Sequence, residues 1–116
     1  MLGVGVFEFG PPDALRVVDL PEVHAGPGEV RVRVYAAAVN PTVLSIRNGA
    51  RAERLSQISP PYIPGMDAAG VIDEIGPGTE TDLAVGMAVM AMVVPLGDHG
   101  AYRTSIVLSA DSVVKA

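Results

Sequence analysis

The stretch Glu29-Val30-Arg31-Val32-Arg33-Val34-Tyr35 decides the fold, because apolar and polar residues alternate along it with a period of two. Successive side chains of a β-strand point to opposite faces, so this pattern predicts a strand with one buried and one solvated face. The composition Ala25-Gly26-Pro27-Gly28 just before it predicts a turn. The small residues from Ala36 to Val39 prolong the strand and allow another segment to approach its backbone closely.

Short β-prone segments separated by turns fill the rest of the chain, which holds thirteen glycines and ten prolines in 116 residues. This punctuation is typical of a loop-rich β domain with seven or eight short strands. No internal repeat and no linker divides the sequence, so one domain is expected. The other expected strands are Leu2 to Phe9, Leu15 to Leu20, Asp67 to Ile75, Met87 to Val94, Ala101 to Leu108 and Val113 to Val114.

One short helix is predicted after the extended strand, from its start and stop signals. Asn40 suits the N-cap, Pro41 the first helical position and Gly49 the residue just past the end. The polar segment from Arg51 to Ser59 is predicted to be a loop. The segment from Ser59 to Gly65 contains three prolines and must run extended, because residues that precede proline avoid the helical region.

The composition argues against several classes of function. Thirteen acidic and eight basic residues give a net charge of −5, so no nucleic-acid partner is expected. The absence of cysteine excludes disulfides and thiolate metal sites, and His24 and His99 alone do not suffice for a zinc site. No apolar run reaches transmembrane length and no signal peptide begins the chain. A cytoplasmic protein without a membrane partner is therefore expected.

A set of motifs, in order and in register, resembles the amino-terminal half of the medium-chain dehydrogenase/reductase family. The match covers almost the whole chain, and the resemblance implies a mainly β, GroES-like domain over residues 1–116. That fold is a bent, partly closed β-barrel with one or two short helices. The motifs are Phe7 to Gly10, Leu15 to Val17, Gly26 to Val34, Val39 to Pro41, Ile46 to Gly49, Pro64 to Ile72, Gly76 to Gly78, Val85-Gly86 and Gly100 to Tyr102.

The positions of the zinc ligands distinguish branches of this family. Zinc-dependent members have a cysteine where this chain has Asn40 and a histidine where it has Met66. An amide and a thioether do not replace the thiolate and imidazole of a tetrahedral zinc site. The resemblance therefore points to the zinc-independent quinone oxidoreductases and their enoyl-reductase relatives, and it implies a site without metal.

This resemblance implies hydride transfer from NADPH to a quinone or another α,β-unsaturated carbonyl. Family members bind NADPH mainly through a Rossmann domain, and no G-x-G-x-x-G motif follows a strand in these 116 residues. The chain is therefore expected to be a substrate-side domain that is inactive alone. The alternative is a stand-alone GroES-like module that acts by protein contact. It would form a homodimer or bind a separate cofactor domain through the apolar stretch Met87 to Val94 and a normally buried face.

The resemblance places Asn40, Pro41 and Thr42 beside the nicotinamide. Asn40 would hydrogen-bond the cofactor or a substrate carbonyl, and local rules alone also allow it to be the cap of the short helix. Thr42 would donate a hydrogen bond to a developing oxyanion, or it is an ordinary threonine of the first helical turn. Asn40 and Thr42 are therefore the candidate catalytic residues.

A second group of residues is expected at the substrate cleft. Tyr62 and Ile63 either line the mouth of the cleft or fill space beneath the proline-rich loop. Gly65 is expected to serve backbone conformation and close packing. Without zinc, Asp67 is expected to anchor backbone amides or an arginine at the edge of the cleft.

Overall fold

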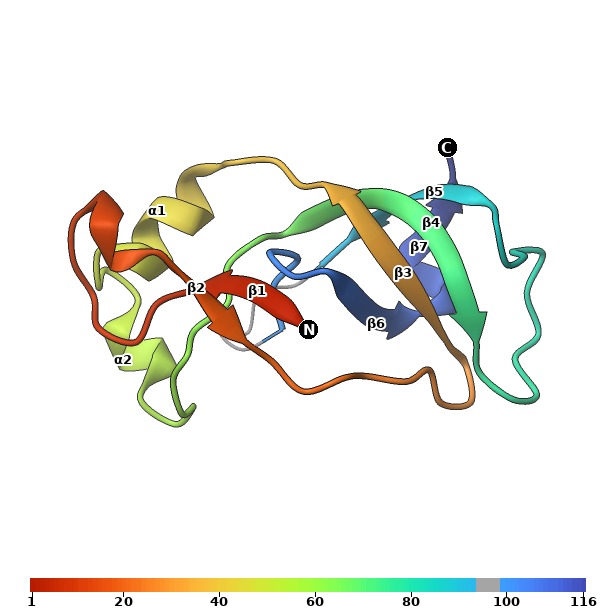
Figure 1. Ribbon diagram of the computed structural model, residues 1–116, viewed down its shortest axis with the longest axis horizontal. Helices are drawn as coiled ribbons and strands as arrows, with labels where there is room; N and C mark the ends of the chain where they lie inside the picture. Colours follow the sequence, from red (N-terminus) through yellow and green to blue (C-terminus); the bar gives the residue numbers. More distant parts are fainter. Residues whose placement is uncertain (94–98) are drawn as a thin grey trace.

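The computed structural model describes residues 1–93 and 99–116, which form two antiparallel sheets and two short helices (Figure 1). The strands are β1 (Leu2–Gly5), β2 (Arg16–Asp19), β3 (Glu29–Ala36), β4 (Asp67–Ile75), β5 (Ala88–Met92), β6 (Ser105–Ser109) and β7 (Val113–Lys115). The helices are α1 (Pro41–Arg47) and α2 (Ala52–Leu55), and two 3₁₀ turns span Pro12–Ala14 and Ala110–Ser112.

The larger sheet has the strand order β6-β3-β4-β5-β7, and every neighbouring pair in it is antiparallel. Its edge strands β6 and β7 are separated in sequence only by the turn Ala110–Ser112, so they approach each other at one end. The sheet curls, with β4 bent across it (Figure 1), but β6 and β7 do not pair. This arrangement confirms the predicted mainly β, bent and partly closed barrel.

The alternating segment forms β3, which lies between β6 and β4. Val30 and Val32 are completely buried and Arg33 is exposed, so the predicted alternation is confirmed. Burying each such side chain contributes roughly 1.5–3 kcal/mol, so this face of β3 stabilises the sheet. The buried core around it consists of Val30, Val32, Ala68, Ile72, Val89, Ala91, Val93, Ala101, Ile106, Leu108 and Val113.

The structure corrects the predicted ends of several strands. The first strand stops at Gly5 rather than Phe9, because its partner begins opposite Gly5 and Val6 pairs with Tyr62 instead. The strand predicted from Ala101 begins only at Ser105, since Ala101 and the residue after it donate their backbone N–H groups to Gly65 and Pro64. β5 lies within the predicted stretch Met87 to Val94, of which Val94 is outside the described residues.

The prediction of a loop from Arg51 to Ser59 is wrong in part, because α2 occupies Ala52–Leu55. Leu55 is its one buried residue and packs inward from an otherwise exposed turn. A single apolar residue gives no helical periodicity, so this helix left no pattern to detect. Among residues 1–93 and 99–116, no helix has the length and apolar character needed to cross a membrane.

The two helices lie at one end of the molecule and the five-stranded sheet at the other, with the β1–β2 hairpin between them (Figure 1). Two single bridges, Gly3 with Arg103 and Val6 with Tyr62, join the hairpin to the rest of the chain. Residues 37–40 carry the chain from the end of β3 to the start of α1 and belong to no strand, so the predicted prolongation of β3 to Val39 is wrong beyond Ala36. Of the predicted catalytic residues, Asn40 ends this connection and Thr42 lies in the first turn of α1.

Candidate functional site

Asn40, Pro41 and Thr42 lie at the junction between β3 and α1. Asn40 has extended backbone angles (φ −137°, ψ 172°) and occupies the N-cap position, and Pro41 is the first helical residue. Asn48 ends the helix, and Gly49 follows it with a φ of +87°, in the left-handed region that glycine favours. The helix therefore begins and ends where the sequence signals predict.

The Asn40 side chain does not make the capping hydrogen bond that its position suggests. Its Oδ1 atom is buried and has no hydrogen-bond partner among the described residues. Leaving a buried acceptor unpaired costs about 1–3 kcal/mol, which the cap would have avoided. The junction thus holds a buried amide oxygen whose hydrogen bonding the described residues leave unsatisfied.

Two linked hydrogen bonds hold the Thr42 backbone at the start of α1. The Ser45 hydroxyl donates to the Thr42 carbonyl oxygen at 2.9 Å, and Arg51 Nε donates to the same hydroxyl oxygen at 2.7 Å. Arg51 follows α1 in the chain. The two hydrogen bonds therefore connect the turn after the helix to Thr42, in the first turn of the helix. Thr42 is partly buried, and Pro41, which separates it from Asn40 in the chain, is exposed.

Asp67, at the start of β4, anchors the connection that carries Asn40. Its Oδ1 accepts the backbone N–H of Ala38 at 2.8 Å. This contact is of the kind expected from the sequence, a carboxylate that binds a backbone amide. The carbonyl oxygen of the same alanine accepts a hydrogen bond from the Tyr102 hydroxyl at 3.1 Å. Both backbone polar groups of Ala38 are therefore bound by side chains from other parts of the chain.

Tyr102 is the site residue that the sequence reasoning missed. Burial raises the pKa of its phenol, and the negative charge of Asp67 raises that pKa further. The hydroxyl therefore stays protonated and able to donate at neutral pH. The sequence feature that could have identified Tyr102 is the motif Gly100-Ala101-Tyr102. It supports the family resemblance, but it predicts no functional role for the tyrosine.

Gly65 permits the close contact that places Tyr102. Its φ is +112°, and a Cβ there would lie 2.8 Å from the Ala101 nitrogen and 2.9 Å from a ring carbon of Tyr102. The Gly65 carbonyl oxygen accepts the Ala101 N–H at 3.0 Å, and the Pro64 carbonyl oxygen accepts the Tyr102 N–H at 3.1 Å. The segment before β4 and the segment before β6 are thus packed backbone to backbone.

Tyr62 and Ile63 contact the amino-terminal segment. The Tyr62 ring stacks on Phe9, with centroids 5.4 Å apart and an interplanar angle of 8°. Tyr62 also exchanges two backbone hydrogen bonds with Val6, at 2.8 and 3.0 Å. Ile63 is only 1% exposed, which fits the space-filling alternative for that side chain.

An apolar hollow of about 480 Å³ lies beside the anchored connection. Its walls are mostly small side chains from the ends of β3, β4 and β5, with one carboxylate among them. Such a lining suits an apolar ring. The lining residues are Ala36, Ala37, Ala38, Asp67, Ala68, Ala69, Met90 and Ala91, so Asp67 is the predicted cleft residue that faces it. Among the described residues, no group of three or more histidine, aspartate or glutamate side chains is placed to hold a metal ion.

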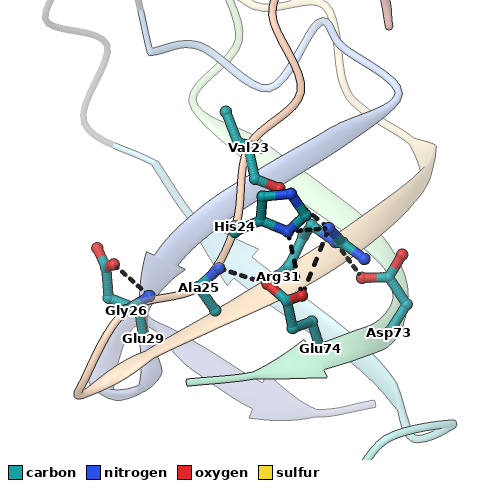
Figure 2. A network of polar contacts seen from close by, with 8 residues as sticks. All are labelled: Val23, His24, Ala25, Gly26, Glu29, Arg31, Asp73 and Glu74. Atoms are coloured by element: carbon teal, nitrogen blue, oxygen red, sulfur yellow. Dashed lines mark hydrogen bonds and ion pairs between the residues drawn. The ribbon is translucent and has the colours of Figure 1, made fainter. Parts of the chain in front are cut away.

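A second polar network lies where the start of β3 pairs with the end of β4, and it includes none of the predicted site residues (Figure 2). Arg31 Nε donates to Asp73 at 2.7 Å, and Arg31 Nη1 donates to the Val23 carbonyl oxygen at 3.0 Å. Glu74 accepts the Ala25 N–H and lies 3.2 Å from His24 Nδ1. These contacts lower the pKa of Glu74, through the Ala25 amide first and His24 second. The network fastens the segment that precedes β3 to the sheet.

Comparisons with known proteins agree with this architecture. The Alcohol dehydrogenase GroES-like domain family matches residues 26–116. The chain is 32% identical to human quinone oxidoreductase in an alignment that covers 89% of the chain and 33% of that protein. The structure of quinone oxidoreductase from Coxiella burnetii superposes with a TM-score of 0.86 at 28% identity, over 99% of the chain and 36% of that structure.

A mycobacterial protein whose structure was solved in complex with NADPH is also similar. It gives a TM-score of 0.79 at 28% identity and covers 100% of this chain and 34% of that one. The chain thus spans about a third of the length of the proteins it matches. From the family match, the strand order and the motif set together, the chain belongs to the alcohol dehydrogenase GroES-like domain family, with quinone oxidoreductases among its relatives.

Proposed function

We propose that this chain is the substrate-side domain of an NADPH-dependent oxidoreductase that reduces quinones or other α,β-unsaturated carbonyls without zinc. The relatives named quinone oxidoreductase support the substrate class, and the NADPH complex of the mycobacterial relative supports the cofactor. The observation that carries the proposal is the buried, unpartnered Oδ1 of Asn40 at the β3–α1 junction.

Asn40, Pro41 and Thr42 fit the nicotinamide end of such a cofactor. A buried acceptor without a protein partner is satisfied by a ligand N–H group, and Asn40 Oδ1 has that character. When bound, NADPH supplies the hydride. The residues of this chain then orient the reactants and stabilise charge. The Thr42 hydroxyl donates to the substrate oxygen on which negative charge develops.

The donor set at the position of the family's metal site supports zinc-free chemistry. Asn40 and Met66 occupy the positions at which the zinc-dependent branch of the family carries a thiolate and an imidazole. A neutral amide and a thioether are poor ligands for Zn²⁺ but suit hydrogen bonding and packing. The substrate carbonyl is therefore activated by hydrogen-bond donors in this proposal.

The substrate is held against the apolar hollow beside Asp67. A quinone or enone ring suits walls of alanine and methionine, and the Asp67 carboxylate stands at the hollow while bound to the backbone of Ala38. In this proposal residues 1–116 form the substrate-side wall, and a Rossmann domain outside these residues holds the rest of NADPH. These 116 residues are then inactive alone.

The test compares the 116-residue chain with the product of the complete reading frame that contains it. NADPH binding is measured by calorimetry, and quinone-dependent NADPH oxidation by absorbance. We expect turnover and binding by the complete product and neither by the 116 residues. Turnover by the 116 residues alone would disprove the division of labour. If the complete product binds NADPH but does not reduce quinones or enones with it, the proposed reaction is disproved.

A second candidate function, a GroES-like module that acts by protein contact, is favoured by one exposed apolar patch. Met90 and Met92 on β5 are 51% and 73% exposed, and Val114 on β7 is 57% exposed directly opposite Met90. Adjacent exposed apolar side chains on one sheet face favour association. Light scattering distinguishes the two functions, because a strictly monomeric chain that binds no partner contradicts the module.

A further inference from the structure

We infer that Asp67 and Tyr102 are positioning residues that hold the connection formed by residues 37–40 and so fix the Asn40 amide at the site. The inference rests on the proposed function of Asn40 and adds the residues through which the fold presents it. Neither side chain needs to touch the cofactor or the substrate for this role.

Side chains from other parts of the chain hold the connection between β3 and α1 in place. Residues 37–40 lie outside every strand, and α1 begins only at Pro41. Ala38, in the middle, donates its N–H to Asp67 Oδ1 at 2.8 Å and accepts the Tyr102 hydroxyl at 3.1 Å. The two groups come from β4 and from the segment before β6, so Ala38 is clamped between two separate parts of the chain.

This clamp is close enough to Asn40 to control it. Asn40 lies two positions after Ala38, and the next residue, Pro41, has its own φ fixed by its ring. Fixing Ala38 on one side and Pro41 on the other leaves few backbone rotations for Asn40. An amide oxygen that is buried without a partner would otherwise rotate toward water, so its retention in the site requires a rigid support.

The chemistry of the two positioning residues matches the groups that they bind. A carboxylate only accepts and therefore suits the Ala38 N–H, whereas a protonated phenol donates and suits the Ala38 carbonyl. The charge of Asp67 also disfavours ionisation of Tyr102, which keeps the phenol a donor. Gly65 completes the arrangement, because a side chain at that position would collide with the Tyr102 ring.

The experiment measures two NMR signals in the ¹⁵N-labelled 116-residue chain, which the proposal treats as a folded domain. The first is the hydrogen-exchange rate of the Ala38 amide, and the second is the relaxation of the Asn40 side-chain amide. The variants are Asp67→Ala, Asp67→Asn and Tyr102→Phe. The matched controls are Asp82→Ala, at an exposed aspartate, and Tyr35→Phe, at a tyrosine that is 68% exposed.

We expect Asp67→Ala to speed Ala38 exchange about tenfold and to increase the mobility of the Asn40 side chain. Asp67→Asn keeps an acceptor oxygen and should restore both signals toward those of the unmodified chain. Tyr102→Phe should increase the mobility of the Asn40 side chain, whereas its control, Tyr35→Phe, should not. If Asp67→Ala fails to fold, the comparison of Tyr102→Phe with Tyr35→Phe still tests the inference. An Asn40 signal that is unchanged in Tyr102→Phe and Asp67→Ala would overturn it.

Turnover by the complete product separates this inference from the proposed function. If the proposed function and the positioning role both hold, Asn40→Ala lowers kcat. Asp67→Ala and Tyr102→Phe then each lower kcat by about tenfold, and Asp67→Asn restores kcat toward the value of the unmodified protein. If Asn40→Ala has no effect on turnover, the proposed role of Asn40 fails, whereas the NMR result on its positioning still stands. If Asn40→Ala lowers kcat but the other variants match the controls, positioning fails and the proposed function survives.

Discussion

Glu74 accepts the backbone N–H of Ala25 at 2.5 Å, and this contact joins two residues that are 49 positions apart. It fastens the segment between β2 and β3 to β4, at the end of the sheet opposite the helices (Figures 1 and 2). The bound amide and the nearby His24 lower the pKa of Glu74. Because this carboxylate is partly exposed, its stabilisation responds to pH and to salt.

We predict that the contribution of Glu74 to stability is lost in acid. A carboxyl group whose pKa is lowered by folding stabilises the folded state above its ordinary pKa of 4.5 and loses that effect as the pH falls through the lowered value. Urea unfolding of the unmodified chain and of Glu74→Gln should therefore differ at about pH 7 and converge toward about pH 3. Glu80→Gln, at an exposed glutamate, serves as the control. A difference that persists unchanged in acid would contradict this assignment.

Gly65→Ala should destabilise the chain more than Gly78→Ala. Both glycines have positive φ, +112° and +68°, so each substitution strains the backbone by about 1–3 kcal/mol. Only at Gly65 does the new Cβ also collide with backbone and ring atoms, since nothing lies within 4 Å at Gly78. Denaturant midpoints measure both losses. Equal losses would show that the packing between Gly65 and Tyr102 is looser than described.

Ile72→Ala should cost about 2–5 kcal/mol of unfolding free energy, because Ile72 is completely buried in the core of the five-stranded sheet. Val17→Ala, at a side chain that is 68% exposed on β2, should change stability by less than about 0.5 kcal/mol. Thermal and urea unfolding check both values. A cost for Ile72→Ala as small as that for Val17→Ala would mean that the core is not where the structure places it.

Thr42→Val should lower kcat of the complete product by about 10²-fold, because the isosteric side chain lacks the hydroxyl donor proposed for the developing oxyanion. Thr42→Ser keeps that donor and should retain most of the activity. Steady-state quinone reduction measures both. If valine and serine behave alike, Thr42 is an ordinary residue of the first helical turn.

The sequence predicted the elements whose signals are local and periodic. Alternation located β3, and the sequence Asn40-Pro41 with the later Gly49 located α1 to the residue. It could not locate α2, whose single buried residue, Leu55, creates no periodicity. Strand ends were also missed, because Gly5 ends β1 only through the position of its partner strand.

For the candidate site, the sequence suggested Asn40 and Asp67 but not Tyr102, and it did not identify the backbone groups that Asp67 and Tyr102 bind. Asn40 was expected either to cap the helix or to face a cleft, and only the three-dimensional structure shows that its oxygen has no partner among the described residues. The pairing of Ala38 with Asp67 and Tyr102 joins positions 29 and 64 residues apart, and no local rule contains such distances. Long-range hydrogen bonds to single backbone groups leave no pattern in one sequence.

In the proposed function, hydrogen bonds take the place of a metal: Asn40 binds the nicotinamide, and the Thr42 hydroxyl donates to the substrate oxygen. The most direct measurement is kcat for quinone-dependent NADPH oxidation by the complete product in chelator-treated buffer, with Asn40 intact and with Asn40→Ala. We predict full activity without metal and a loss of about 10²–10³-fold in the variant. Activity that disappears with the chelator and returns with zinc, or an Asn40→Ala variant with unchanged kcat, would contradict the claim.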